Sequence, residues 1–405
     1  MILERGSEQL LGLSDGWEVK RVELDTVQGE VAVHIECGQK ELADPFTQVP
    51  CKVYDHPPVR RWRHLETMRY KTYLSCALPR IELPDGKVKT VDPPWASSHE
   101  RHTYLFEHLM IDLLNATGDQ TRSAKLLRCG FNVVNRIVHL SVRRGMTKRP
   151  LGGAHFTHLS ADEKSFKNGH KCGTVLSDPF SGRVLDVEED RTKEACKNVL
   201  DRALTTTQQQ QVRTVTMDMW KAHITTAIER LPQARIIHDR FHLVKYLNTA
   251  LNQVLRREAK TYSELKQTRY TLLKNPENLT EKQRIKFEHI KAANFEVARA
   301  WQTRENFKDL FSSSALRRTA DQLYMQWASD TMNRKITELS KVVVMFNARV
   351  RGMLNALASP LSSAMAERPN RKIQQLKSVG RGYRTFANFR SAILFFHGGL
   401  NLYPL

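Results

Sequence analysis

The feature that most constrains the fold of this chain is the regular succession of strand-like and helical patterns across residues 155–245. β-Branched and alternating stretches predict strands, and apolar residues at three-to-four spacing predict helices. The predicted strands are Phe156–Ala161, Lys171–Ser177, Arg183–Val187, Val212–Met217 and Ala234–His238. The predicted helices are Lys193–Leu204 and Met219–Leu231, and the polar run Thr205–Gln211 is predicted to be a linker. This part of the chain is therefore expected to form an α/β domain.

The order of these elements, three antiparallel-type strands followed by helix, strand, helix and strand, is that of a ribonuclease H-like α/β fold. In such a sheet the first and fourth strands lie side by side, so acids that follow them come together. Asp162 follows the first predicted strand and Asp218 follows the fourth. Glu163 is the nearest rival to Asp162, but side chains alternate along a strand and the two would lie on opposite faces. We favour Asp162.

Carboxylates placed in this way predict a metal site. Two adjacent carboxylates raise each other's pKa unless a cation neutralises them, and hard oxygen ligands suit Mg²⁺ or Mn²⁺. A third acid, Glu367, lies in a helix-forming stretch near the C-terminus. We predict that Asp162, Asp218 and Glu367 are metal ligands and catalytic residues for in-line phosphoryl transfer. A lone acid at a strand end is more often a helix cap; the order of three acids favours the metal site.

The charge balance predicts a polyanionic partner. The 405 residues hold 63 Lys and Arg against 43 Asp and Glu, a net charge of +20, and a cation that neutralises a phosphate releases condensed counterions. A basic ribosome-like protein is the plainer alternative. The apolar runs are too short to span a bilayer and the first residues lack the apolar core of a secretory signal, so we expect a cytoplasmic protein with no membrane partner. Six scattered cysteines without a Cys-x-x-Cys pair predict buried thiols.

Residues 98–150 carry the pattern of a helix-turn-helix module, and residues 1–97 predict a small, mostly β module before it. Asp119 is a predicted cap for the second helix and Asn132 for the third. The first helix is expected from an apolar stripe made by Leu105, Phe106, Leu109, Met110 and Leu113. Three short helices with a tight turn before the last are typical of a DNA-binding module.

The third of these helices is the predicted DNA reader. It is expected over Asn132–Arg144, with Arg136 and His139 facing outward and Arg143 and Arg144 at its end. We predict that these four side chains contact DNA, Arg136 at base edges and Arg143 or Arg144 at phosphates.

The remaining chain predicts a long insertion and a closing segment. Residues 246–360 are almost wholly helical in pattern and rich in Lys and Arg, which indicates a basic helical insertion. Residues 361–405 hold Glu367 and a last helix striped by Phe386, Phe389, Ile393 and Phe396, which should pack on the core. The catalytic domain is therefore predicted in two parts, residues 151–245 and 361–405.

Several blocks of the chain resemble bacterial insertion-sequence transposases of the IS-L-three family, which belong to the DDE class. The blocks are Leu159–Ser165, Gly169–Lys171, Thr216–Trp220, Ala234–Leu243, Arg381–Arg384 and Asn388–Phe396, with Arg61–Leu65 and Pro94–Ala96 nearer the N-terminus. The resemblance covers nearly the whole chain.

This resemblance implies a ribonuclease H-like catalytic domain, binding of double-stranded DNA at the terminal inverted repeats of the element, target DNA as a second substrate, and Mg²⁺-dependent cleavage and strand transfer. It places the triad on Asp162, Asp218 and Glu367, and implies a nucleoid-associated protein that handles two DNA ends, for which a homodimer is expected. Asp239-x-x-His242 resembles an accessory motif of related transposases. His242 then orients a ligand or touches the scissile phosphate; the alternative is an imidazole satisfied within the helix start.

The sequence departs from the family in two places. A zinc module usually opens such chains, but here the ligands have thinned to lone cysteines such as Cys51, so we expect no zinc. Glu367-Arg368-Pro369-Asn370 stands where Glu-Gly-x-Asn is expected, and Pro369 disfavours helical geometry at Arg368. Pro369 is tolerated if it lies in the first turn of a helix, which would place Glu367 just ahead of that helix; the alternative is a displaced acid. The alternatives to an active transposase are a catalytically decayed DNA-binding protein and a nuclease with the same metal site but no strand transfer.

Overall fold

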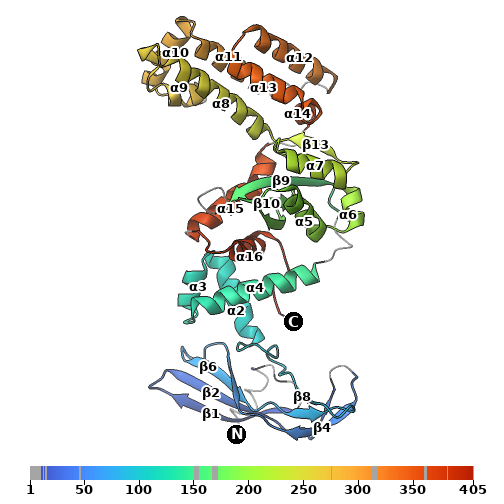
Figure 1. Ribbon diagram of the computed structural model, residues 1–405. Helices are drawn as coiled ribbons and strands as arrows, with labels where there is room; N and C mark the ends of the chain where they lie inside the picture. The colour runs from blue at the N-terminus through green and yellow to red at the C-terminus, as the bar shows by residue number, and fades with distance from the viewer. Residues whose placement is uncertain are drawn as a thin grey trace. The chain divides into compact units, whose positions relative to one another are not determined.

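A computed structural model gives the fold of the chain (Figure 1). It describes residues 11, 13, 16–44, 47–149, 155–166, 172–274, 276–311, 317–359, 363–380 and 382–404, without the side chains of residues 276, 317–318 and 363–368. The chain divides into two compact units, residues 1–149 with 400–405 and residues 150–399, which are treated separately below. No helix within the described ranges is long and apolar enough to cross a membrane.

Among the described residues, the N-terminal part of the first unit has eight strands in two four-stranded sheets, which confirms the predicted β-rich module. The first sheet has the order β1-β2-β6-β5 and the second β3-β4-β7-β8. The strands are β1 (Trp17–Asp25), β2 (Glu30–Cys37), β3 (Glu41–Ala43), β4 (Pro50–Asp55), β5 (Arg60–Arg63), β6 (Lys71–Cys76), β7 (Arg80–Glu82) and β8 (Val88–Thr90). Trp62 of β5 is fully buried and packs edge-on against Trp95, so this arginine-rich strand contributes to the core as well as to the charge.

Three helices follow in the same unit: α2 (Tyr104–Thr117), α3 (Gln120–Leu126) and α4 (Phe131–Lys148). Asp119 caps α3 as predicted, accepting from the backbone N–H groups of Thr121 and Arg122. The predicted cap of the third helix was wrong: Gly130, not Asn132, is the N-cap of α4.

The apolar stripe of α2 is also shifted from the predicted one. Leu105 and Leu109 are exposed, because the buried face runs through Phe106, Met110 and Leu114 at intervals of four. The last residues of the chain belong to this unit rather than to the catalytic part. The Tyr403 hydroxyl lies 2.6 Å from an Asp112 carboxylate oxygen.

The second unit contains a five-stranded sheet of order β11-β10-β9-β12-β13. β9 pairs antiparallel with β10, and β10 with β11, whereas β12 runs parallel to both β9 and β13. The strands are β9 (His158–Ser165), β10 (Cys172–Ser177), β11 (Val184–Glu189), β12 (Thr214–Met217) and β13 (Arg235–His238). All five predicted strands are confirmed. β9 runs on through Asp162 to Ser165, so this acid lies within the strand and not after it.

Helices cover both faces of this sheet. α5 (Lys193–Ala203) and α7 (Lys221–Arg230) share an apolar core with one face, and that core includes Leu159, Ala161 and Val199. The predicted linker 205–211 is instead a short helix, α6 (Thr206–Gln211), which begins with a capping box made by Thr205 and Gln208. The reciprocal side-chain bonds of such a box satisfy two backbone N–H groups, and this lets a polar run become helical.

The segment after β13 is helical, as predicted, and forms its own core with Leu247, Phe307 and Phe346 among its buried residues. Its α-helices are α8 (Arg240–Glu258), α9 (Arg269–Leu273), α10 (Glu281–Ala292), α11 (Glu296–Asp309), α12 (Arg317–Asn333), α13 (Thr337–Asn347) and α14 (Val350–Leu357). α14 returns to the sheet, where the Asn355 amide donates to the Ile236 carbonyl of edge strand β13 at 2.8 Å. A helix over an edge strand satisfies exposed backbone groups and protects the edge.

Two helices close the second unit, α15 (Ser363–Val379) and α16 (Phe386–His397). Phe389 and Ile393 of α16 are buried, as predicted. Pro369 lies inside α15 rather than in its first turn, so of the two starts weighed for this helix the structure shows the earlier one. The helix begins six residues earlier and continues through the ring.

Candidate active site

Asp162 and Asp218 occupy neighbouring positions on adjacent strands. In the parallel pair β9–β12, Met217 lies opposite Ala161, so the next residue of each strand is one of the two aspartates. Their side chains are 14% and 15% exposed. Ala161 packs in the core beneath α5, and alternation along β9 turns Asp162 to the opposite face. The strand register therefore places the two acids at adjacent backbone positions.

Asp162 is held by donors from three elements. The Asn370 amide of α15 donates to its Oδ2 at 2.5 Å, and the Lys164 ammonium lies 3.2 Å from the same oxygen. The Glu163 backbone N–H donates to Oδ1 at 2.7 Å. Burial by itself would raise the pKa of Asp162, but the neighbouring His242 and Lys164 outweigh it and hold the pKa well below its usual range. This carboxylate is therefore ionised.

Asp218 receives a backbone N–H and faces a buried histidine. Its Oδ1 accepts from the Trp220 N–H at 3.0 Å, and His223 Nδ1 of α7 lies 3.6 Å away. His223 is fully buried, with its Nε2 3.5 Å from the Thr174 hydroxyl of β10. Burial would raise the pKa of Asp218; His223 and the Trp220 N–H together lower it. Asp218 is therefore ionised as well.

The first turn of α8 brings a histidine to the pair. Asp239 is the N-cap of this helix and accepts from the Phe241 N–H at 2.9 Å. Three residues on, His242 Nε2 lies 3.7 Å from Asp162 Oδ1. Burial would lower the pKa of His242, but the carboxylate of Asp162 raises it. His242 thus contributes positive charge beside the carboxylates.

Glu163 points away from this group, as strand alternation predicts. Its carboxylate pairs with Arg191 at 3.0 Å. The Arg191 guanidinium stacks over the Trp220 ring at 4.2 Å, and the Trp220 indole N–H donates to the Arg191 carbonyl at 2.9 Å. Glu163 therefore holds the loop that follows Asp218.

Glu367 is the fifth residue of α15. Its side chain is outside the described residues. Asn370, which reaches Asp162, is three positions further along the same helix, and positions three apart share a helix face.

The four predicted DNA contacts on α4 have different surroundings. Arg136 is half-exposed and pairs with Glu100 at 2.8 Å, Arg143 is exposed and His139 half-buried. Arg144 instead donates to the fully buried Glu107 of α2 at 3.0 Å and to the Leu402 carbonyl at 3.0 Å. Burial raises the pKa of Glu107 even beside this guanidinium. Arg144 thus has partners inside the protein, unlike the phosphate contact predicted for it.

Comparison with known proteins identifies the family. A family model described as Transposase, that of the DDE transposases of the IS-L-three type, matches residues 159–393, more than half of the chain. The chain belongs to this family. The transposase for insertion sequence element IS1557 of Mycobacterium tuberculosis is 28% identical over 357 residues, 81% of this chain and 79% of that protein. The transposase for insertion sequence element IS1001 of Bordetella parapertussis is 24% identical over 393 residues, 95% and 96% of the two chains.

Transposases of the DDE class generally use divalent metal ions, and the donor set of this transposase fits one. The carboxylates of Asp162 and Asp218 are adjacent, ionised and partly exposed, and they are oxygen ligands of the kind that Mg²⁺ prefers. Among the described side chains, no group of three or more His, Cys, Asp or Glu is placed to hold a metal ion. The side chains of residues 363–368 in α15, Glu367 among them, lie outside the description.

Sequence reasoning missed three residues of this site. Asn370 was noticed only as part of a motif, and Lys164 and His223 were not considered. Lys164 is two positions from Asp162 and so on the same strand face, a signal that was available. His223 had no such signal, because its distance from Asp218 is fixed by how α7 packs behind β10 and β12.

Proposed function

We propose that this transposase binds the ends of its insertion sequence and cleaves and transfers DNA strands at a metal site formed by Asp162, Asp218 and Glu367. The observation that carries this proposal is the placement of Asp162 and Asp218 side by side on parallel strands β9 and β12. Repelling carboxylates kept ionised at a partly exposed strand edge are suited to a divalent cation and to phosphoryl transfer.

The strand order supports a ribonuclease H-like catalytic domain. Its first three strands form antiparallel pairs, and the fourth joins the first in parallel. This arrangement is the one expected of that fold from the sequence. The long helical segment between β13 and α15 interrupts the domain, and α15 returns Asn370 to Asp162 across 208 positions of sequence.

The path of α15 supports Glu367 as the third ligand. Asn370 fixes one face of this helix against Asp162, and Glu367 is one turn earlier on that face. Pro369 removes one backbone hydrogen bond and crowds the preceding turn, yet the helix extends to Val379. The unbroken helix shows that the weak motif match is compatible with an intact third position. It therefore favours an active enzyme over a decayed one.

Divalent metal, when bound, supplies stabilisation of the attacking and leaving oxygens. The chain's own residues prepare the site for it. Asn370 holds the Asp162 carboxylate in a fixed orientation by a hydrogen bond. His223 of α7 lies beside the Asp218 carboxylate and restricts its orientation. His242 and Lys164 place positive charge where a scissile phosphate would lie, and they limit repulsion between the carboxylates before metal binds.

The test is cleavage of DNA that carries the element's own ends, with and without Mg²⁺. The wild type should cleave only with the metal, and Asp162→Asn should lose at least about 10³-fold of the rate. Asp201→Asn is the matched control, because Asp201 is an exposed acid of the same unit that pairs with Arg230. Cleavage by Asp162→Asn within a few-fold of the wild type would remove this residue from the catalytic set.

Glu367 needs a test of its own. Glu367→Gln should reduce cleavage as strongly as Asp162→Asn, because the amide cannot contribute a charged ligand. Glu338→Gln is the control: Glu338 pairs with Arg257 on the helical insertion at 2.9 Å. Full activity of the Glu367 variant would mean that another residue closes the metal site.

DNA-end recognition is assigned to α4 in a helix-turn-helix arrangement of α2, α3 and α4. Asn132, Arg136 and Arg143 are exposed on this helix, and a recognition helix presents such residues to the major groove. Arg136→Ala should reduce preference for the element's ends over random duplex, whereas Arg143→Ala should weaken both equally. If Arg136→Ala lowered affinity for the element's ends and for random duplex equally, Arg136 would be assigned to phosphate contact. Two ends handled together imply a homodimer on DNA.

A further inference from the structure

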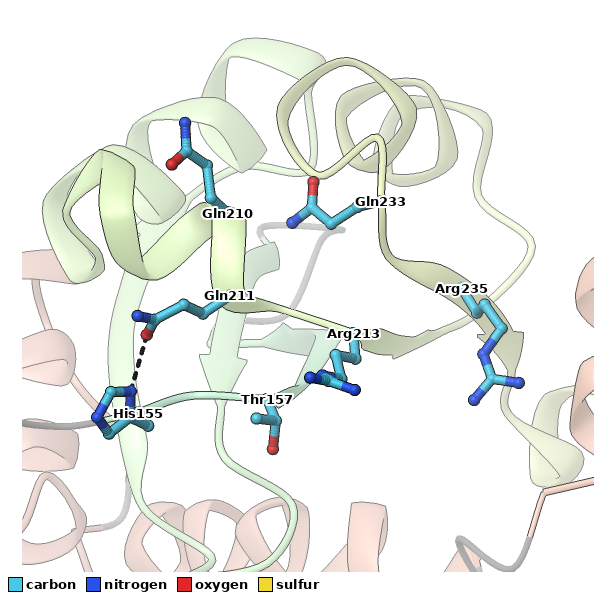
Figure 2. A pocket seen from close by; sticks show the side chains of 7 residues that line it. All are labelled: His155, Thr157, Gln210, Gln211, Arg213, Gln233 and Arg235. Atoms are coloured by element: carbon cyan, nitrogen blue, oxygen red, sulfur yellow. Dashed lines mark hydrogen bonds between the residues drawn. The ribbon is translucent and has the colours of Figure 1, made fainter.

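A second polar site lies at the end of the sheet opposite the carboxylates. The parallel strands β9, β12 and β13 begin there, and a hollow of about 730 Å³ lies beside their first residues. Arg213 and Arg235 precede or open β12 and β13, and the Arg235 backbone N–H donates to the Arg213 carbonyl at 2.8 Å. Figure 2 shows both guanidinium groups extending to the same side of this hollow.

The other walls of the hollow are polar. They carry the side chains of Thr157, Gln210, Gln211, Gln233 and His155. His155 Nδ1 lies 3.0 Å from Gln211 Oε1 (Figure 2), so the amide nitrogen of Gln211 is left to donate elsewhere. The Gln233 amide donates to the carbonyls of Gln209 and Val212 at 2.6 and 3.1 Å, and these bonds fix the loop before Arg235.

An adjoining hollow extends the positive charge. Arg235 lines it as well, and its volume is about 920 Å³. Arg349 and Arg351, at the start of α14, line it together with apolar side chains that include Ile224 and Ile228. Among the described residues that line the two hollows there is no Asp or Glu. We call the joined hollows the arginine groove. Its side chains are complementary to an anion with several charged groups.

We propose that the arginine groove binds the phosphodiester backbone of a DNA segment other than the one at the carboxylates. This inference rests on the proposed function, because it assumes that DNA is the substrate. Its guanidinium groups are spread over two adjoining hollows rather than gathered at one point, which suits successive phosphates better than one small anion.

The separation of the two sites requires a different DNA segment. Five residues of extended chain separate Arg213 from Asp218, a distance of roughly 17 Å along the strand direction. One phosphate cannot contact both. The groove therefore holds DNA several base pairs from the scissile bond, or a second duplex, and it fixes that DNA while the carboxylates act.

The test is the salt dependence of DNA binding by the full chain. Arg213→Gln with Arg235→Gln should reduce the slope of log affinity against log salt by about 2, since each lost phosphate contact removes about 0.9. Affinity for a long duplex carrying the element's end should fall at least tenfold, and Arg→Lys at both positions should restore most of the slope. Cleavage at saturating DNA should stay within about twofold, because neither arginine touches the carboxylates.

The matched control is Lys193→Gln with Arg230→Gln. It removes the same charge from the same unit, but these cations already pair with Glu229 and Asp201. Equal loss of slope in the control and the groove variant would overturn the site and leave only a net-charge effect. Inorganic pyrophosphate at constant ionic strength separates a small-anion site: if it competes fully with DNA for the groove at micromolar concentration, the backbone assignment is wrong.

The outcomes separate this inference from the proposed function. A wild type that cleaves its ends while the groove variant keeps an unchanged slope overturns the arginine groove alone. If the groove variant shows the expected change in slope but the wild type never cleaves its ends, the proposed activity is overturned and the groove is supported.

Discussion

Two aspartate sites on one sheet behave in opposite ways. Asp186 of β11 is fully buried and accepts from Arg202 Nε at 2.9 Å and from Arg390 at 2.8 and 3.1 Å. These fork-shaped donors join α5 and α16 to the edge strand and leave the carboxylate no free oxygen. Asp162 meets only single-point donors, an amide, an ammonium and an imidazole, and it stays partly exposed.

The comparison separates a structural carboxylate from a functional one by its partners rather than by its residue type. A planar guanidinium binds both oxygens and is always charged, so it competes strongly with any cation. Lys164 can move aside when a metal ion arrives, and His242 can move aside or lose a proton. Asp186 is thus expected to matter for stability, and Asp162 with Asp218 for chemistry.

The largest effect expected from this contrast is at Asp218. Asp218→Asn keeps the bond from the Trp220 N–H but removes a charged metal ligand, so cleavage should fall by about 10³-fold or more while the midpoint of thermal unfolding changes little. Single-turnover cleavage and calorimetry on the same preparation measure both. A large drop in the midpoint would mean that Asp218 is structural like Asp186, and the contrast would fail.

Asp186→Asn should give the opposite result. The variant leaves two guanidinium groups without their charged partner, which should cost about 3 kcal/mol of folding free energy, or roughly 6–12 °C for a unit of this size. DNA cleavage below the new midpoint should remain near the wild-type rate. Denaturant titration and the cleavage assay check this, and loss of cleavage in a fully folded variant would contradict it.

Asn370 tests the single-point donors directly. Asn370→Ala should raise the Mg²⁺ concentration needed for half-maximal cleavage by about 10- to 100-fold, because a group that orients a ligand tunes metal affinity. Asn355→Ala is the control, since its amide binds the Ile236 carbonyl far from the carboxylates. If both variants shifted the Mg²⁺ dependence equally, Asn370 would act through folding alone.

The sequence predicted the sheet and its two aspartates well, because strand alternation and turn chemistry are local signals. Asp162 and Asp218 follow from element order alone. Asp186 was not singled out, since its partners Arg202 and Arg390 lie 16 and 204 positions away and no local pattern connects them. The pairing of Arg144 was not predicted for the same reason: its partner Glu107 is 37 positions away, on another helix.

The helix boundaries predicted from the sequence were wrong where capping and tertiary packing outweighed the local helix propensity of the residues. The polar run 205–211 has weak helix formers, yet the Thr205–Gln208 box and the burial of Gln208 and Gln209 make it helical. Pro369 is a strong local stop signal, but packing of α15 against the sheet carries the helix through it. The arginine groove was likewise not predicted from the sequence, because Arg213 and Arg235 become neighbours only when β12 and β13 pair.

His64 extends the comparison to a titratable group that is buried without an opposite charge. It is 5% exposed, and its Nδ1 lies 2.9 Å from the hydroxyl of Thr103, the N-cap of α2. Burial, aided by the charge of Arg63, lowers the pKa of His64 to about 4. Asp186 is buried between two guanidinium groups, whereas His64 stays neutral because no opposite charge lies beside it.

The pH dependence follows from the direction of this shift. Between pH 6.5 and 4 the unfolded chain binds a proton at His64 that the folded chain does not, so stability is full above pH 6.5 and is lost as the pH falls through that window. From pH 7 to pH 5 the loss should be about 2 kcal/mol. His64→Gln should remove this part of the pH dependence in denaturant titrations of the full chain, whereas the exposed His56→Gln should not. An identical pH profile for wild type and His64→Gln would show that the pKa of His64 is the same in the folded and the unfolded chain, and that burial without an opposite charge does not lower it.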